Sequence, residues 1–253
     1  MTHSGWRAIL FDLDGTLRYN TPAANDILLS QAVLLGAADH PTRRQRALRW
    51  AHFYWANSPT LLKDLHRYPE RSADFWVQYT LRQLLAFGCT YHQATRLAAK
   101  VQKYMEQAYQ PEDRLFPGLP EMLHTLRESG YRLGVLSNRP RPFHDYMEEK
   151  GLVPYFDLIL AAGEVGVWKP SARVFQAAAE RMRVSPTEVV YVGDNYFADV
   201  VGARRAGLFP VLIDAEGLFA GMDCPSIATV TQITPSFLEN LAEGARPTAD
   251  LRR

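Results

Sequence analysis

The chain has 253 residues, 47% of them hydrophobic, and its formal net charge is +1 at pH 7. A chain of this length can bury roughly three quarters of its unfolded surface, which allows a full hydrophobic core and a smaller second unit. Because nucleic-acid-binding proteins usually carry a concentrated excess of basic residues, the near-zero net charge argues against that class.

The sequence also argues against a membrane or disulfide-bonded protein. No apolar run approaches the length of a membrane span, and the first residues, MTHSGW, lack the basic-then-apolar order of a signal peptide. Cys89 and Cys224 lie far apart and form neither a metal-binding pattern nor a disulfide framework. We therefore expect a cytoplasmic protein without a membrane partner, in which the cysteines are packing residues.

The first informative stretch is ILFDLDGTL, residues 9 to 17. Its apolar start predicts a strand over residues 7 to 12 that is buried on both faces. Asp12 and Asp14 are one residue apart, a spacing that places both side chains on the same face of a strand. Two carboxylates this close resist ionising together unless a cation lies between them, which provides a general acid beside a nucleophile. Gly15 allows a sharp turn at the carboxyl end of the strand, where parallel sheets bind their ligands.

The segment from residue 20 to residue 111 has helical patterns and no strand pattern, which predicts an all-helical insertion. The expected helices cover residues 21–38, 42–58, 60–67, 69–87 and 90–110. Residues 21 to 110 contain 11 Lys and Arg against 6 Asp and Glu, a net charge of +5, and the remainder has 17 against 21, a net charge of −4. A basic lid would attract an anionic substrate.

Two features of this insertion have an ordinary structural interpretation. Four arginines between residues 43 and 49 are typical of a solvated helix face. The aromatic residues are more often packing residues than a substrate wall; they are Trp50, Tyr54, Trp55, Trp76 and Tyr79. We therefore name no substrate from them.

From residue 118 onward, helix and strand patterns alternate. The predicted strands cover residues 131–138, 156–160, 189–193, 210–214 and, as a short sixth strand, 227–230. The predicted helices cover residues 118–130, 141–150, 171–182, 199–205 and a segment from about Ser236, before a polar tail at 245–253 that we expect to fray. This alternation predicts an α/β fold with a parallel sheet covered on both faces. The helical insertion must then leave and rejoin the sheet at the carboxyl edge, above Asp12.

Polar side chains follow three more of these strands. Ser137 and Asn138 end the second strand, where a hydroxyl and unpaired amides before a helix can hold a phosphate. Lys169 follows the third strand, and its ammonium can balance a nucleophilic carboxylate and phosphoryl oxygens together. Asp194 and Asp199 follow the fourth strand. All of these residues are expected at the same edge of the sheet.

The acidic residues at this edge suit a hard divalent cation such as Mg²⁺, which prefers oxygen ligands. Asp12 and Asp194 can each supply a carboxylate oxygen, and Asp14 can supply its main-chain carbonyl. Asp199 can hold Lys169 or a water molecule of the cation. The alternative for the last two aspartates is a helix cap and a surface residue, which explains each one but not their recurrence at one edge.

The order of these four motifs resembles that of the haloacid dehalogenase-like hydrolase superfamily, across about two thirds of the chain. The resemblance implies a Rossmann-like, doubly wound core at residues 1–19 and 112–253, with a helical cap at residues 20–111. It also implies magnesium and an aspartyl-phosphate intermediate, with Asp12 as the nucleophile and Asp14 as the acid and base.

The resulting hypothesis is hydrolysis of a small phosphorylated metabolite. Ser137 and Lys169 would hold the phosphoryl oxygens, and Thr16 and Asn138 would orient the reacting groups as part of the phosphate site. One departure from the family is Arg18, Tyr19 and Asn20, where many of its sugar-phosphate and phosphoglycolate phosphatases have an acidic residue and a serine or threonine. These substrates are therefore in doubt.

Three alternatives stay open. A dehalogenase would share the fold, but members with that activity lack the second aspartate of the pair, which is present here as Asp14, and need no magnesium. A phosphomutase would share the intermediate and differ in its product. A catalytically silent binding protein would have kept the fold alone. The sequence predicts no oligomeric state.

Overall fold

The computed structural model describes residues 5–245 of the chain and divides into two compact units. Within the described residues, the first unit comprises 5–18, 115–216 and 222–245. The second comprises 19–114 and 217–221. The polar tail for which we expect fraying lies, from residue 246 onward, outside the described residues.

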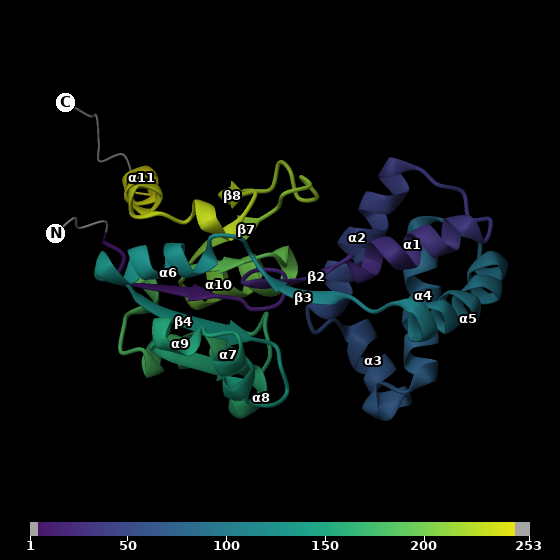
Figure 1. The fold of residues 1–253 in the computed structure, drawn as a ribbon, viewed down its shortest axis with the longest axis horizontal. Coiled ribbons are helices and arrows are strands. Elements are labelled where there is room, and N and C mark those ends of the chain that lie inside the picture. The colour runs from purple at the N-terminus through teal and green to yellow at the C-terminus, as the bar shows by residue number, and fades with distance from the viewer. Residues whose placement is uncertain (1–4, 246–253) are drawn as a thin grey trace. The chain divides into compact units, whose positions relative to one another are not determined.

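The first unit is built on a parallel sheet of six strands within the described residues (Figure 1). In spatial order the strands are β5 (Leu158–Ala161), β4 (Arg132–Ser137), β1 (Ala8–Phe11), β6 (Val189–Gly193), β7 (Phe209–Ile213) and β8 (Ser226–Ile227). β1 lies between β4 and β6, with Ala8 paired to Arg132 on one side and to Val189 on the other. The strands that follow β1 in the sequence therefore lie first on one side of it (β4, β5) and then on the other (β6, β7, β8). Ligands of such sheets bind at the carboxyl ends of the strands, at the point where the strand order changes direction.

Helices cover both faces of this sheet, which explains why every residue of β1 is buried. One face packs against α6 (Leu119–Glu128), α7 (His144–Glu149) and α11 (Pro235–Ala245). The other face packs against α9 (Ala172–Arg181) and α10 (Val201–Ala206). Alternate side chains of β1 point to opposite faces of the sheet: Ile9 and Phe11 pack on the first face and Leu10 on the second. This is the predicted α/β fold.

The second unit contains the predicted helices. They are α1 (Ala24–Leu34), α2 (Pro41–Trp55), α3 (Pro59–Arg67), α4 (Ala73–Phe87) and α5 (Tyr91–Ala108). The sequence determines several of their ends: proline opens α2 and α3, and Gly88 ends α4 in a left-handed conformation. Thr90 and Gln93 form a capping box at the start of α5, in which the main-chain amide of Gln93 donates to Thr90 Oγ1 over 3.2 Å.

Some elements were not predicted. β2 (Arg18–Thr21) and β3 (Glu112–Leu115) pair with each other at the two ends of the helical insertion, where we expected no strand. A short helix, α8 (Ala162–Val165), follows β5, and a π-helical turn over Tyr196–Val200 precedes α10. β2, β3 and α8 have only four residues each, too few for the hydrophobic period that identifies an element.

The segment Gly217–Gly221, far along the chain from the other residues of the second unit, also groups with that unit. The Arg49 side chain donates a hydrogen bond to the carbonyl of Leu218, and the rings of His52 and Phe219 have centroids 5.4 Å apart. Leu218 and Phe219 are both buried. A sequence reading that followed the chain in order had no signal for this contact.

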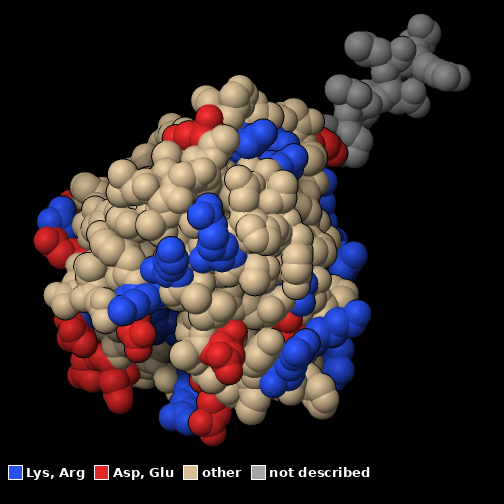
Figure 2. All heavy atoms as spheres, turned by 90° about the vertical axis from the view of Figure 1, so that its right-hand side faces the viewer, with Lys and Arg blue, Asp and Glu red and all other residues tan. Residues whose placement is uncertain are grey.

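The surface of the helical unit carries charges of both signs. Figure 2 shows Lys and Arg in several separate places across one face, with Asp and Glu between them. The net positive charge of the insertion is thus spread out, as expected for solvated helix faces. Cys89 and Cys224 are unpaired thiols. Among the described residues, no helix has both the length and the hydropathy needed to cross a membrane.

Candidate active site

The turn after β1 sets the position of Asp12. The amides of Leu17 and Arg18 both donate to the carbonyl of Leu13, over 3.0 and 3.1 Å, and close the turn. Gly15 has a φ of +90°, and a Cβ at this position would lie 2.4 Å from Oδ2 of Asp194. Only glycine fits both constraints. The turn therefore brings the main chain of the first motif against the carboxylate of the fourth.

Lys169 lies at the centre of the buried groups. Its Nζ donates to Oδ1 of Asp12 over 2.6 Å, to Oδ1 of Asp199 over 2.7 Å and to the Tyr191 hydroxyl over 3.0 Å. All four residues are buried, with Lys169 3% and Asp12 6% exposed. The ammonium thus has its three donors satisfied at once. The structure brings together Asp12, Lys169 and Asp199 as the sequence predicts.

The π-helical turn holds Asp199 in this position. The main-chain amide of Asn195 donates to Oδ2 of Asp199 over 2.9 Å, and Oδ1 of Asp199 accepts from the lysine. A Cβ on Gly193 would lie 2.4 Å from the same Oδ2. Gly193 is therefore needed for close approach of the carboxylate to the end of β6, and insertions of this helical type are frequent at functional sites.

The charges at this site do not balance. Among the described residues, the buried Asp12 and Asp199 and the half-buried Asp194 lie near one ammonium, that of Lys169. Burial, together with the nearby carboxylates of Asp199 and Asp14, raises the pKa of Asp12 from 3.8 to about 7, although Lys169 opposes this. Burial and the charges of Asp12 and Asp199 raise the pKa of Asp194 well above its usual value. A cation would favour the ionised forms.

Lys169 itself stays charged in this environment. Burial alone would lower the pKa of its ammonium, but the carboxylates of Asp12 and Asp199 raise that pKa well above its usual value. The lysine is therefore a fixed positive charge and has no proton to give at ordinary pH.

The acidic residues fit a divalent metal ion. Oxygen atoms of Asp12, Asp194 and Asp199 all lie within 4.8 Å of one another. Hard cations such as Mg²⁺ take carboxylate oxygens as ligands, and the uncompensated negative charge favours such an ion here. Since Oδ1 and Oδ2 of Asp199 already bind Lys169 and the Asn195 amide, Asp12 and Asp194 are the better-suited ligands.

The hydroxyl groups of the predicted phosphate site differ in their surroundings. Ser137 ends β4 and is 2% exposed, and no hydrogen bond joins its hydroxyl to another described residue. Thr16 is fully buried, and its Oγ1 lacks a hydrogen-bond partner within residues 5–245. Ser137 can thus bind a ligand oxygen at the sheet edge, whereas nothing in this geometry supports a phosphate contact of Thr16.

Asn138 orients Lys169, which agrees with the orienting part of its predicted role. Its Nδ2 donates to the carbonyl of Lys169 over 3.1 Å, and its Oδ1 accepts from the amide of Lys169 over 2.8 Å. Both polar atoms of the side chain are therefore used by the main chain of Lys169. The structure makes Asn138 a residue that positions the lysine, in place of a direct phosphate ligand.

Asp14 is more exposed than the other carboxylates. Its side chain is 43% exposed and forms ion pairs with Arg18 and Arg139, both over 3.0 Å. An exposed carboxyl group beside a buried nucleophile is accessible to a leaving group and to water. The predicted acid and base is therefore present at the rim. Two arginines hold it: Arg18, noted in the sequence only as a departure from the family, and Arg139, which the sequence analysis did not single out.

Tyr191 is a further residue that the sequence reading missed. Its hydroxyl accepts from Lys169 over 3.0 Å and donates to the carbonyl of Leu136 over 3.2 Å. In the sequence it lies inside the apolar run VVYVG, which predicts a buried strand and gives no separate role to the tyrosine. The signal was available, because a tyrosine in a fully buried strand needs a partner for its hydroxyl.

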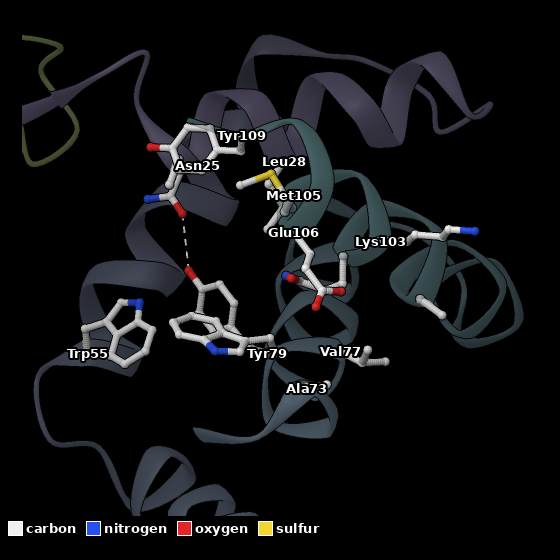
Figure 3. Close-up of a pocket in the computed structure, with 14 residues that line it drawn as sticks. Asn25, Leu28, Trp55, Ala73, Val77, Tyr79, Lys103, Met105, Glu106 and Tyr109 are labelled. Carbon is white, nitrogen blue, oxygen red and sulfur yellow. Dashed lines mark hydrogen bonds between the residues drawn. The ribbon is translucent and has the colours of Figure 1, made fainter. Parts of the chain in front are cut away.

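The helical unit has a separate pocket of about 730 Å³, lined by residues of α1, α2, α4 and α5. Trp55, Trp76 and Tyr79 form part of its wall, and Figure 3 shows the Tyr79 hydroxyl directed toward Asn25. That hydrogen bond measures 3.2 Å. The interpretation of these aromatic residues as packing residues is thus incomplete, because three of them also face a cavity.

Comparison with known families agrees with this site. The family of haloacid dehalogenase-like hydrolases matches residues 6–207, which is most of the chain. The chain therefore belongs to the haloacid dehalogenase-like hydrolases. The acid pair, Ser137, Lys169 and the Gly193-Asp194 dipeptide all lie within the matched residues.

Relatives with different activities are similar to the chain. A phosphoserine phosphatase of Thermus thermophilus is 30% identical over 230 residues, which cover 82% of this chain and 88% of the relative. An (S)-2-haloacid dehalogenase of Burkholderia cepacia is 30% identical over 83% of this chain and 84% of its own. A glyceraldehyde 3-phosphate phosphatase of Methanothermobacter thermautotrophicus is 36% identical, but over only 41% of this chain and 46% of its own.

Solved structures agree on the fold. A 2-haloacid dehalogenase from Pseudomonas syringae has a TM-score of 0.52 at 24% identity, covering 95% of this chain and 100% of its own. A phosphatase of the same superfamily from Thermococcus onnurineus has a TM-score of 0.51 at 24% identity, covering 89% and 95%. At this identity the likeness concerns the fold, and the chemistry must be argued from the site.

Proposed function

We propose that the protein hydrolyses a small phosphomonoester with the help of Mg²⁺, through a phosphorylated Asp12. The observation that carries this proposal is the group of three carboxylates around the Lys169 ammonium, of which Asp12 and Asp199 are buried and Asp194 is half-buried. Such a group has an excess of negative charge that a divalent cation compensates. Two further features support the proposal. The Ser137 hydroxyl can donate to an anionic substrate at the same sheet edge, and the charge of Lys169, whose three donors are already used, can stabilise that substrate.

The chemistry divides into two steps. In the first, a carboxylate oxygen of Asp12 attacks phosphorus, the bond from phosphorus to the ester oxygen breaks, and Asp14 gives its proton to the leaving alcohol. In the second, Asp14 takes a proton from a water molecule whose oxygen attacks phosphorus. The bond from phosphorus to Asp12 then breaks, and inorganic phosphate and the Asp12 carboxylate are released.

The other residues bind and orient. Lys169 holds Oδ1 of Asp12, so that the nucleophile keeps a fixed direction, and its charge stabilises the phosphoryl oxygens. Asn138 fixes the main chain of Lys169, and Tyr191 and Asp199 fix its ammonium. When bound by Asp12, Asp194 and the main-chain carbonyl of Asp14, Mg²⁺ supplies further positive charge against the phosphoryl group.

Cleavage of a carbon–halogen bond is the rival function, because a dehalogenase is as similar to the chain as the phosphoserine phosphatase is. Asp14 favours the phosphatase. A halide leaves without a proton, whereas an alcohol leaving from phosphorus needs an acid, and Asp14 lies two residues from the nucleophile with an exposed carboxyl group. The three acidic groups that suit a metal ion favour the same choice.

A screen of phosphorylated metabolites for phosphate release tests the proposal. Assays run with Mg²⁺ and with EDTA, and 2-chloropropionate is tested in parallel for halide release. We expect turnover of at least one phosphate ester with Mg²⁺, loss of that turnover in EDTA, and none of it in Asp12→Asn. The exposed Asp223→Asn is the matched control. Halide release that survives EDTA, without phosphate release, would contradict the proposal.

A further inference from the structure

The carboxylate of Asp14 is held by two guanidinium groups. Nε and Nη2 of Arg139 donate to Oδ2 and Oδ1 of Asp14, over 3.2 and 3.0 Å. Nη1 of Arg18 donates to Oδ1 over 3.0 Å. Oδ1 thus accepts two charge-assisted hydrogen bonds and Oδ2 one. A paired, two-point contact of this kind fixes the plane of a carboxylate, which a single contact does not.

Arg139 is itself fixed by its surroundings. Its guanidinium lies over the ring of Tyr146, 4.6 Å from the centroid, and over the ring of Phe143 at 5.3 Å. Its main-chain carbonyl accepts from the amide of Gly163 over 3.1 Å. A Cβ on Gly163 would lie 2.0 Å from the carbonyl of Pro140, so the loop that carries the arginine is tightly packed. The Arg139 side chain is therefore ordered before it binds the carboxylate.

These features distinguish the contact from an ordinary surface ion pair. Exposed pairs such as Arg114 with Glu112 contribute little to stability, because ordering two long side chains offsets their attraction. Arg139 is only 28% exposed, is stacked on two rings and contacts both oxygens of its partner. Its partner is the acid and base of the proposed reaction, which must meet the leaving oxygen in one orientation.

We propose that Arg139, assisted by Arg18, is a positioning residue for Asp14. It directs Oδ2, which accepts one hydrogen bond from the described residues where Oδ1 accepts two, toward the leaving group. The role rests on the proposed phosphatase function. Arg139 acts through Asp14 and does not itself contact the phosphoryl group. Its effect is therefore confined to steps that need the proton of Asp14.

This role predicts a dependence on the leaving group. The value of kcat/KM covers the reaction up to departure of the alcohol, whereas kcat also includes release of phosphate from Asp12. An alkyl ester such as O-phosphoserine needs a proton as its alkoxide leaves, and p-nitrophenyl phosphate needs one much less. We expect Arg139→Met to lower kcat/KM for O-phosphoserine by about 10- to 100-fold, a part of the rate that general acid catalysis contributes. The loss for p-nitrophenyl phosphate is expected to be at least fivefold smaller.

Four variants complete the experiment. Arg139→Lys restores a charge without the two-point contact, so it recovers only part of the loss on O-phosphoserine. Asp14→Asn shows the larger loss of the acid itself, and adding Arg139→Met to it has no further effect if the arginine acts through Asp14. Arg141→Met, an exposed arginine two residues along the chain, is the matched control and keeps the kinetics of the unchanged protein.

The outcomes separate this role from the proposed function. Equal losses on both esters, or additive losses in the double variant, would overturn the positioning role while the phosphatase function stands. If the unchanged protein releases phosphate from neither these esters nor the metabolite panel, the phosphatase function fails, and the role of Arg139 fails with it. A selective loss on O-phosphoserine that Arg139→Lys partly reverses supports the role.

Discussion

Each unit of the molecule contains an ionic network around a buried aspartate and a buried tyrosine hydroxyl, and the two networks differ in charge balance. In the helical unit, Arg82 donates to both oxygens of Asp64 over 2.8 and 2.9 Å, and the Tyr54 hydroxyl donates to Oδ2 over 3.0 Å. In the sheet unit, Lys169 binds Asp12, Asp199 and Tyr191 in a similar way.

Charge balance distinguishes a structural ion pair from a reactive one. The network of the helical unit has one carboxylate and one guanidinium, so its charges cancel. The network of the sheet unit has three carboxylates near one ammonium, and the pKa of Asp12 rises to about 7 because burial and the excess negative charge disfavour ionisation. Balanced charges are typical of a structural ion pair, whereas an excess of negative charge favours binding of a cation and, through it, of a phosphate, as expected of a reactive site.

The largest expected effect is on activity, from Asp12→Asn. Removing the nucleophile lowers turnover by about 10³-fold or more. Because the raised pKa shows that an ionised Asp12 is unfavourable in the folded state, the substitution does not lower stability in EDTA at pH 8. Phosphate release and thermal unfolding measure the two effects. A variant that has lost activity only because it no longer folds would contradict this account.

The same chemical change in the balanced network has the opposite effect. Asp64→Asn leaves Arg82 and the buried Tyr54 hydroxyl without their charged partner, and we expect a loss of roughly 2–4 kcal/mol in the free energy of unfolding. Three of the five tryptophans belong to the helical unit, so tryptophan fluorescence follows its unfolding. The exposed Asp74→Asn is the control and changes stability by less than about 0.5 kcal/mol. Equal losses in the two variants would refute the contrast.

A smaller effect is expected from pH and Mg²⁺. Asp12 keeps its proton in the folded state up to about pH 7, whereas its ordinary pKa is 3.8, so stability without metal falls as the pH rises between these values. Mg²⁺ favours the ionised carboxylates. At 100 times its dissociation constant it contributes about 2.7 kcal/mol, which corresponds to roughly 5–10 °C in Tm.

This stabilisation should therefore be large at pH 8 and small at pH 5.5, which thermal unfolding with Mg²⁺ or EDTA measures. Asp194→Asn removes a ligand and should reduce the shift, while the control Asp223→Asn, at an exposed aspartate outside the acidic groups that could hold a metal, keeps it. A shift that is the same at both pH values, or unchanged in Asp194→Asn, would rule out a cation held by these carboxylates.

The sheet unit was largely predictable from the sequence. Each of its central motifs follows a short apolar strand, and parallel strands bring their carboxyl ends to one edge, so Asp12 and Lys169 could be placed together before any coordinates existed. What pattern reasoning lacked was the partner of each polar atom. Asn138 was expected to orient the reacting groups as part of the phosphate site, but the sequence did not show that its side-chain amide would bind the main chain of Lys169.

The helical unit was predictable in its elements but not in its interior. Hydrophobic period and caps located the helices, because both signals are local in sequence. The pocket beside Trp55 and Trp76 depends on how the helices pack, and the contact of Arg49 with Leu218 joins residues far apart in the chain. Arg139 was missed for a related reason: its partner, Asp14, lies on another loop.

Trapping of the phosphorylated enzyme tests the central claim most directly. A turnover mixture with Mg²⁺ and the best ester is quenched in acid and treated with borohydride, which reduces an acyl phosphate to the alcohol. Trypsin then releases residues 8–18, the peptide AILFDLDGTLR, which contains both Asp12 and Asp14. We predict that fragmentation places the reduced side chain at Asp12. If the enzyme turns over substrate but its peptide is never modified at Asp12, or is modified at Asp14, the account is contradicted.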